Sequence, residues 1–139
     1  MEPVTKVDPS IDKLEKLFEM QYKMQTEAMH FDFINMSEQE RGTFVKNHSL
    51  YCMDELHEMF HEIPFFKEWK RYSKDPEDNL WKWAAARKEF VDALHFFINV
   101  AIGLGFTADE LFKMYCIKNN INYERQKDQT EYKPSADEA

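Results

Sequence analysis

Residues 80–102, LWKWAAARKEFVDALHFFINVAI, decide the fold of this chain. Apolar residues recur there at three- and four-residue steps, the spacing that makes side chains neighbours on an α-helix. They cover much more than one face, which is typical of a helix buried on several sides. The positions are Trp83, Phe90, Val91, Leu94, Phe97, Ile98, Ala101 and Ile102. The stretch therefore predicts one long helix at the centre of the fold.

Two further helices are predicted on the N-terminal side of this segment. Ser10 is the expected N-cap of the first, whose apolar stripe continues to about Phe33. Ser37 and Glu40 have the spacing of a capping box and begin a second helix, which Pro64 ends. Residues 64–69 are aromatic and predict a short helical turn, whereas residues 72–79 have the composition of a loop.

On the C-terminal side, Gly103 and Gly105 are expected to end the central helix. Thr107 and Glu110 form a second capping box, which predicts a fourth helix. The polar residues that follow Thr130 predict a flexible tail.

The composition agrees with an all-α fold. The chain has 139 residues, of which 43% are hydrophobic, but only three glycines and five prolines for the many turns that an all-β protein needs. We expect a single domain over residues 1–139, a bundle of four to five helices, with flexible segments at residues 1–9 and 130–139.

Charge and cysteine usage restrict the class of function. A net charge of −8 disfavours nucleic acid and anionic membranes as partners. Cys52 and Cys116 lie in helical patterns without a second cysteine at metal-binding spacing, so we expect buried free thiols in a reducing compartment. The chain shows neither a signal-peptide pattern nor an apolar run of about 18 residues. These features favour a cytoplasmic location.

Two pairs of acids have the spacing of metal ligands. Glu55 with Glu58, and Glu89 with Asp92, are three residues apart, so each pair projects from one side of its helix. Both pairs lie among apolar residues, where several negative charges require a cation. A set of oxygen ligands suits Mg²⁺, or Mn²⁺, better than zinc. For either pair alone, a solvated helix face is the simpler interpretation.

A di-iron site is a second hypothesis. Glu58 with His61, and Asp92 with His95, have the Glu-x-x-His type of spacing found in di-iron helical bundles. Such a site also needs single carboxylates from two other helices. The first helix offers Glu19 and Glu27 without marking either as inward-facing.

The fourth helix carries a cationic stripe. Lys118, Asn122 and Arg125 follow one another at steps of four and three residues. Cations near a metal site are typical of polyphosphate binding, although basic residues also complement the C-terminal end of a helix dipole. Among the aromatic residues, Trp69 is the best candidate to stack on a base.

These motifs together resemble the all-α dimeric dUTP diphosphatases, which are related to the MazG-type nucleoside triphosphate pyrophosphatases. The resemblance covers most of the chain in four ordered blocks. They are LFEMQ at 17–21, ELHE at 55–58 followed by FKEWK at 66–70, EFVDALHFF at 89–97, and YCIKN at 115–119 followed by NYERQ at 122–126.

The resemblance implies an Mg²⁺-dependent hydrolysis of dUTP to dUMP and pyrophosphate by a homodimer. It implies that a metal-bound water attacks the triphosphate and that Glu55 orients or deprotonates this water. The remaining implied roles are metal binding by Glu55, Glu58, Glu89 and Asp92, phosphate binding by Lys118, Asn122 and Arg125, and base contacts by Gln21, Trp69 and His95.

Two departures from the family pattern bear on the base. The family often has Asn or Asp four residues after the glutamine of the first helix, where this chain has Gln25. Its glycine–tyrosine tail motif corresponds here to TEYKP at 130–134. A pyrophosphatase for another pyrimidine triphosphate, notably dCTP, therefore stays open, because base selection depends on a few hydrogen bonds.

Overall fold

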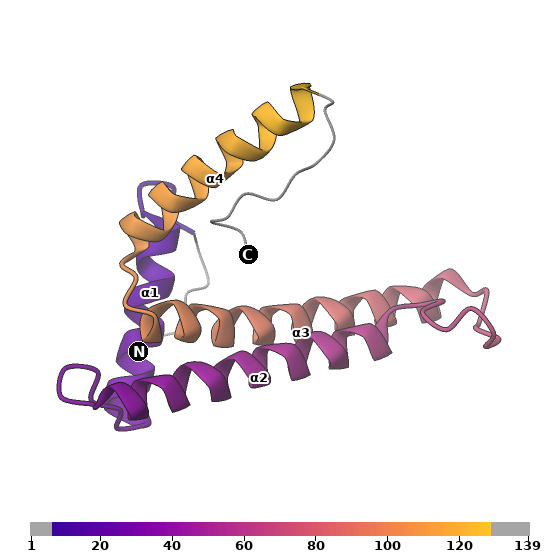
Figure 1. The fold of residues 1–139 in the computed structure, drawn as a ribbon. Coiled ribbons are helices and arrows are strands. Elements are labelled where there is room, and N and C mark those ends of the chain that lie inside the picture. Colours follow the sequence, from indigo (N-terminus) through magenta and orange to yellow (C-terminus); the bar gives the residue numbers. More distant parts are fainter. Residues whose placement is uncertain (1–6, 129–139) are drawn as a thin grey trace.

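A computed structural model describes residues 7–128 (Figure 1). In chain order the elements are α1 (Lys13–Lys23), a π-helical turn η1 (Met24–Ala28), α2 (Glu38–Glu62), α3 (Pro76–Gly103) and α4 (Ala108–Asp128). All regular elements in this described part are helical, which confirms the predicted all-α fold. The TEYKP motif and most of the two predicted flexible segments lie outside the described residues, and Val7 to Pro9 are exposed.

The helices α2 and α3 lie side by side as an antiparallel pair, and α1 lies across the end where α3 finishes (Figure 1). At that end, Phe18 of α1 meets Ile98 and Ala101 of α3 and Ala108 of α4 in the main buried cluster. This core therefore joins α1, α3 and α4 at one end of the molecule. From that end, the paired helices α2 and α3 extend as a two-helix arm.

Side-chain caps set where α1 and α2 begin. The backbone N–H of Glu15 donates to Asp12 Oδ1 over 3.1 Å, so Asp12 caps α1, whereas Ser10 pairs with Asp8. The prediction of Ser10 as the cap was therefore wrong by two residues. Ser37 accepts from the N–H of Glu40 over 3.1 Å, which confirms the predicted start of α2.

The first helix ends earlier than predicted. It widens into η1 and stops at Ala28, and His30 adopts a left-handed conformation with φ 62°. This conformation cannot continue a right-handed helix, so the apolar stripe as far as Phe33 is not helical throughout. Phe31 and Phe33 instead pack against Phe44 of α2 with ring-centroid distances of 4.8 and 5.1 Å.

The third helix contains the whole of residues 80–102 but begins at Pro76. Asp75 accepts from the N–H of Glu77 over 3.0 Å, and proline is favoured in the first helical turn because its missing N–H would be unpaired there. The predicted loop at residues 72–79 is therefore shorter. Residues 64–69 form turns in place of the expected helical turn.

Glycines shape the end of α3. A Cβ atom on Gly103 would lie 2.8 Å from Phe44 Cδ1 and 2.9 Å from Val45 Cγ2, so any other residue there would force these side chains of α2 to shift. Gly105 has φ 87°, a conformation that favours glycine. Thr107 and Glu110 then cap α4 reciprocally, with N–H to side-chain distances of 3.0 and 3.1 Å. The predicted helix end and the second capping box are both confirmed.

Beyond this turn α4 leaves α3 at an angle of 99°. No single helix among the described residues is long and apolar enough to cross a membrane, although α3 and α4 pass that test of length and composition as a bent pair.

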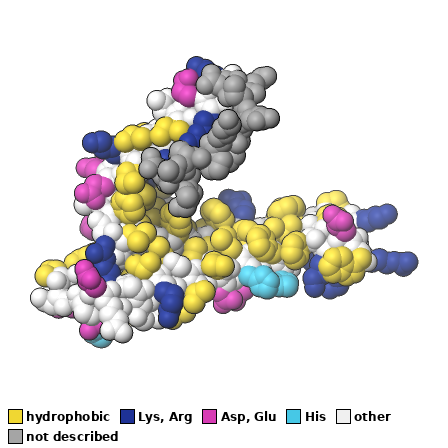
Figure 2. All heavy atoms as spheres, viewed as in Figure 1, with side chains coloured by type: hydrophobic (Ala, Val, Ile, Leu, Met, Phe, Trp, Pro, Cys, Tyr) yellow, Lys and Arg dark blue, Asp and Glu magenta, His cyan; other side chains and the backbone are white. Residues whose placement is uncertain are grey.

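The expectation of a helix buried on several sides holds for only part of α3. Ala86, Ala93 and Ile98 are buried, but Phe90 is 55% exposed and Phe97 54% exposed. Hydrophobic side chains likewise gather along the arm and in the angle between α3 and α4 (Figure 2). Cys116 on α4 is exposed, so its predicted burial was wrong, while Cys52 is half-buried with Sγ 3.4 Å from Ala93 O. One chain thus leaves much of its apolar helix surface uncovered.

The contact at Gly103 predicts a specific stability difference. We expect Gly103→Ala to lower the free energy of unfolding by about 1–3 kcal/mol, because the added methyl group overpacks the contact with Phe44 and Val45. Gly42→Ala is the matched control, since its Cβ meets nothing within 4 Å and alanine favours a helix by up to about 1 kcal/mol. Urea unfolding of the three proteins measures both effects. Equal stability of the two variants would contradict the proposed close approach.

Candidate metal centre

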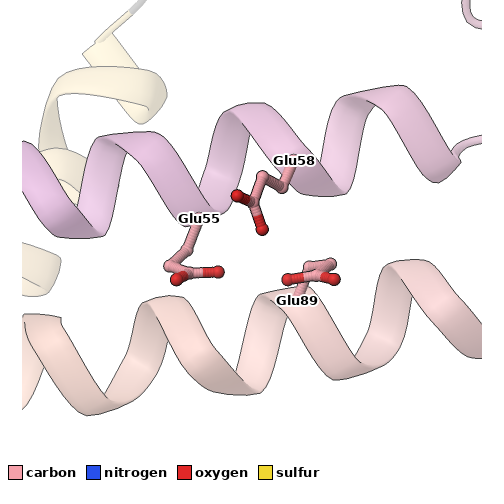
Figure 3. A group of neighbouring side chains, drawn as sticks. All are labelled: Glu55, Glu58 and Glu89. Atoms are coloured by element: carbon pink, nitrogen blue, oxygen red, sulfur yellow. The ribbon is translucent and has the colours of Figure 1, made fainter.

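Three of the four predicted acids form one cluster between α2 and α3. Carboxylate oxygens of Glu55, Glu58 and Glu89 lie within 4.8 Å of one another (Figure 3). Glu55 and Glu58 project together from α2 because they are three residues apart, and Glu89 points toward them from the antiparallel α3. The helix pairing thus adds a third carboxylate to a pair that one helix already provides.

The cluster raises the pKa of Glu55 to about 7. Partial burial of the carboxyl group is the largest cause, followed by a hydrogen bond with the Glu89 side chain, which favours the protonated form. The negative charges of Glu58, Asp92 and Glu89 raise this pKa further. Asp92 is exposed and lies outside the group of three, yet its charge still acts on Glu55. All four predicted acids therefore interact at one place.

The donor set fits a hard divalent cation. An octahedral Mg²⁺ ion with oxygens at about 2.1 Å has neighbouring ligands about 3 Å apart and opposite ligands about 4.2 Å apart. The observed span of 4.8 Å is slightly wider, so small side-chain rotations bring the three carboxylates to that geometry. A cation there would also offset the mutual repulsion that raises the pKa of Glu55.

The geometry does not gather the additional ligands that a di-iron site needs. His61 and His95 are not in the group of Glu55, Glu58 and Glu89, and Nδ1 of His95 lies 2.8 Å from Val91 O in its own helix. Glu19 and Glu27 lie in exposed pairs with Lys16 and Lys23, at 3.2 and 4.0 Å. Among the described residues, the cluster consists of oxygen donors.

The cationic stripe of α4 does not meet this cluster within one chain. At a rise of about 1.5 Å per residue, Glu89 lies about 21 Å from the end of α3 and Lys118 about 15 Å from the start of α4. Since the chain bends by 99° between the two helices, these backbone positions are about 24 Å apart, and Asn122 and Arg125 lie farther along α4. Figure 1 shows α4 rising from the end of α3 at a steep angle to the arm.

The three predicted base contacts come from separate elements. Gln21 is half-buried on α1, Trp69 is 83% exposed in the loop between α2 and α3, and His95 is exposed on α3. No observed contact among the described residues joins these side chains, and their role in base binding stays a prediction.

The burial of three polar residues was not predicted from the sequence. Gln25 in η1 is 5% exposed, and its Oε1 has no hydrogen-bond partner among the described residues. His48 of α2 and Asn99 of α3 are also buried and lie 3.2 Å apart between His48 Nδ1 and Asn99 Nδ2. Each is a polar residue within an apolar helical stripe, which is the signal that could have identified them.

The raised pKa of Glu55 predicts how the stability of the metal-free chain depends on pH. The folded state binds the Glu55 proton more tightly than the unfolded state, so this stabilisation is complete below pH 4.5 and is lost as the pH rises to about 7. In the presence of a chelator, the melting temperature of the wild-type chain should fall between pH 4.5 and about 7, and it should fall more than that of Glu55→Gln.

The buried His48 has the opposite effect on the pH dependence of stability, in the wild type and in Glu55→Gln alike. Burial lowers its pKa, so its contribution to stability is lost as the pH falls below its ordinary value of 6.5. Because His48 is present in both chains, the difference between their melting curves isolates Glu55. Parallel curves for the wild type and Glu55→Gln would show that the cluster does not perturb this carboxyl group.

The structure is that of an all-α protein with a candidate metal site between two antiparallel helices. Comparison with known proteins identifies its family. The family model described as dUTPase matches residues 13–105, and the chain belongs to this family. The matched region contains all four predicted metal-binding acids and the three predicted base contacts. It ends before α4, so Lys118, Asn122 and Arg125 lie beyond it.

Three curated phage proteins are similar over part of their length. The dCTP pyrophosphatase of Enterobacteria phage T4 is 41% identical over 71 residues, covering 44% of this chain and 39% of the relative. The dCTP pyrophosphatase of Enterobacteria phage LZ5 is 33% identical over 104 residues, covering 60% and 58%. A DNA replication protein of phage T4 is 39% identical over 64 residues, covering 39% and 15%.

The matched part of this chain therefore spans less than two thirds of each of these relatives. No solved structure matches the chain.

Proposed function

We propose that this chain is a nucleoside triphosphate pyrophosphohydrolase that converts dUTP to dUMP and pyrophosphate with Mg²⁺. The observation that carries this proposal is the cluster of Glu55, Glu58 and Glu89 within 4.8 Å in a chain of the dUTPase family. The names of the two pyrophosphatase relatives support the class of reaction. Mn²⁺ is the alternative metal, because it accepts the same oxygen ligands.

In this proposal Glu55, Glu58, Glu89 and Asp92 would hold the metal ion, which would supply an acidified water molecule and a positive charge against the phosphates. Glu55 orients this water and accepts its proton. The water oxygen forms a bond to the α-phosphorus, and the bond from that phosphorus to the bridging oxygen of the β-phosphate breaks. The products are the nucleoside monophosphate and pyrophosphate.

The phosphate-binding role of α4 requires a second copy of the chain. The backbone positions of Lys118 and Glu89 are about 24 Å apart within one chain, so the α4 stripe of a partner is the source that we propose for Lys118, Asn122 and Arg125. The exposed apolar surfaces of α3 and α4 support a homodimer, because contiguous apolar surface of this kind is typical of an interface.

The base assignment has two candidates. The family description favours dUTP, while the names of two relatives favour dCTP. In the proposal Gln21, Trp69 and His95 contact the base. The buried Oε1 of Gln25, which has no hydrogen-bond partner within residues 7–128, is a further group that we propose as an acceptor for either pyrimidine.

A substrate panel tests the reaction. We expect pyrophosphate release from dUTP with Mg²⁺, and a loss of kcat of about 100-fold or more for Glu55→Gln, since this change removes the proposed base. Asp54→Asn is the matched control, because it removes a neighbouring exposed acid of α2 that is not in the cluster. Turnover of dCTP equal to or greater than that of dUTP would overturn the uracil assignment. Full activity of Glu55→Gln would overturn the proposed role of the cluster.

Mixing two inactive variants tests the shared site. Glu58→Gln lacks a cluster acid and Arg125→Ala lacks a phosphate contact, so each is expected to be inactive alone. If α4 supplies the phosphate contacts of the partner's site, each mixed dimer contains one intact site out of two. Random mixing makes half of the dimers mixed, so we expect about a quarter of wild-type activity. Sedimentation of each variant should show the same dimer. A mixture without activity, despite subunit exchange, would mean that each chain builds its own site.

A further inference from the structure

Residues 57–61 of α2, HEMFH, place two histidines four positions apart on the helix. Both side chains are exposed, and the centroids of their rings are 4.7 Å apart with the ring planes at 75°. Histidine side chains are also visible at the surface of the arm in Figure 2. Neither His57 nor His61 has a role in the proposed hydrolysis.

The chemistry of this pair differs from that of the acidic cluster. Residues at i and i+4 lie on one helix face, and two imidazoles in a His-Glu-x-x-His sequence on a helix have the spacing with which proteins bind Zn²⁺. Imidazole nitrogen suits Zn²⁺, whereas carboxylate oxygen suits Mg²⁺. The helix thus presents two neighbouring ligand sets of different metal preference.

The charge around the pair also favours a cation. Asp54 lies three residues before His57, Glu58 follows it directly, and Glu62 follows His61. The carboxylate of Glu58 points toward Glu55 and Glu89 (Figure 3), so it adds negative charge near the histidine pair and is not counted as a ligand there. A Zn²⁺ ion there would therefore have two nitrogen ligands and nearby negative charge.

We propose that His57 and His61 form a Zn²⁺-binding site separate from the acidic cluster. Zinc enzymes of the His-Glu-x-x-His type use a third protein ligand, and among the described residues no third side chain is already gathered with these two histidines. The site is therefore a binding site completed by water, without the arrangement of a zinc hydrolase.

Packing is the competing explanation for the pair. The ring of His61 also lies 6.2 Å from that of Phe66, centroid to centroid, in an edge-on arrangement. If packing were the whole role, replacement of the histidines would change stability without affecting metal binding. The two explanations thus differ in a measurement that does not depend on nucleotide turnover.

Zinc titration of the full chain, followed through the ring nitrogens by ¹H–¹⁵N NMR, tests the site. The spectra of His57→Gln and His61→Gln assign the two rings. We expect Zn²⁺ to shift both rings and to leave the exposed His30 ring unchanged. Zinc held only by the carboxylates of the acidic cluster would leave the His57 and His61 rings unchanged, and this result would overturn the proposal.

A competition assay with a chromophoric chelator gives the affinity. We expect the His57→Gln/His61→Gln double variant to bind Zn²⁺ more weakly by about tenfold or more. The His30→Gln control should match the wild type, and circular dichroism should show the same helix content in all three. Unchanged affinity in the double variant would overturn the proposal. Because the readout is zinc binding, this failure is distinct from a failure of pyrophosphate release with Mg²⁺.

Discussion

The close packing of α2 against α3 is the constraint on which the rest of the structure depends. At one end, Gly103 lets the two helices approach until Phe44 and Val45 occupy the space of a side chain. Farther along the same pair, this approach places Glu89 of α3 across from Glu55 and Glu58 of α2. Core packing at the end of the arm and the geometry of the acidic cluster are therefore consequences of one helix–helix contact.

The acidic cluster shows why such a contact must serve something besides stability. Burial of the Glu55 carboxyl group, together with the neighbouring carboxylates, raises its pKa to about 7, which is unfavourable for the metal-free folded chain near neutral pH. Acidic residues in this arrangement are typical of a site that a cation completes. In the hydrolysis that we propose for this member of the dUTPase family, such a cation would also offset charge on the triphosphate.

The divergence of α4 separates the two halves of the proposed site. The 99° bend after Gly105 carries the cationic stripe away from the acids of the same chain and leaves apolar residues on both helices exposed. Both features have one physical explanation if a second chain packs into that angle, since this would cover the apolar surface and supply the cations. The HEMFH sequence adds a different ligand set to the same arm.

The sequence by itself determined the helical class, most caps and the pairing of acids, because these depend on residues three or four positions apart in the chain. Helix starts were predicted less well where a short segment has more than one candidate, because Asp12 and not Ser10 caps α1, and α3 begins at Pro76 within the predicted loop. Only the tertiary structure decided that Glu89 joins Glu55 and Glu58, that Cys116 is exposed, and that Lys118 lies far from the acids. These outcomes depend on helix pairing and on the direction of α4, and contacts between distant parts of the chain are not encoded in the periodicity of any one segment.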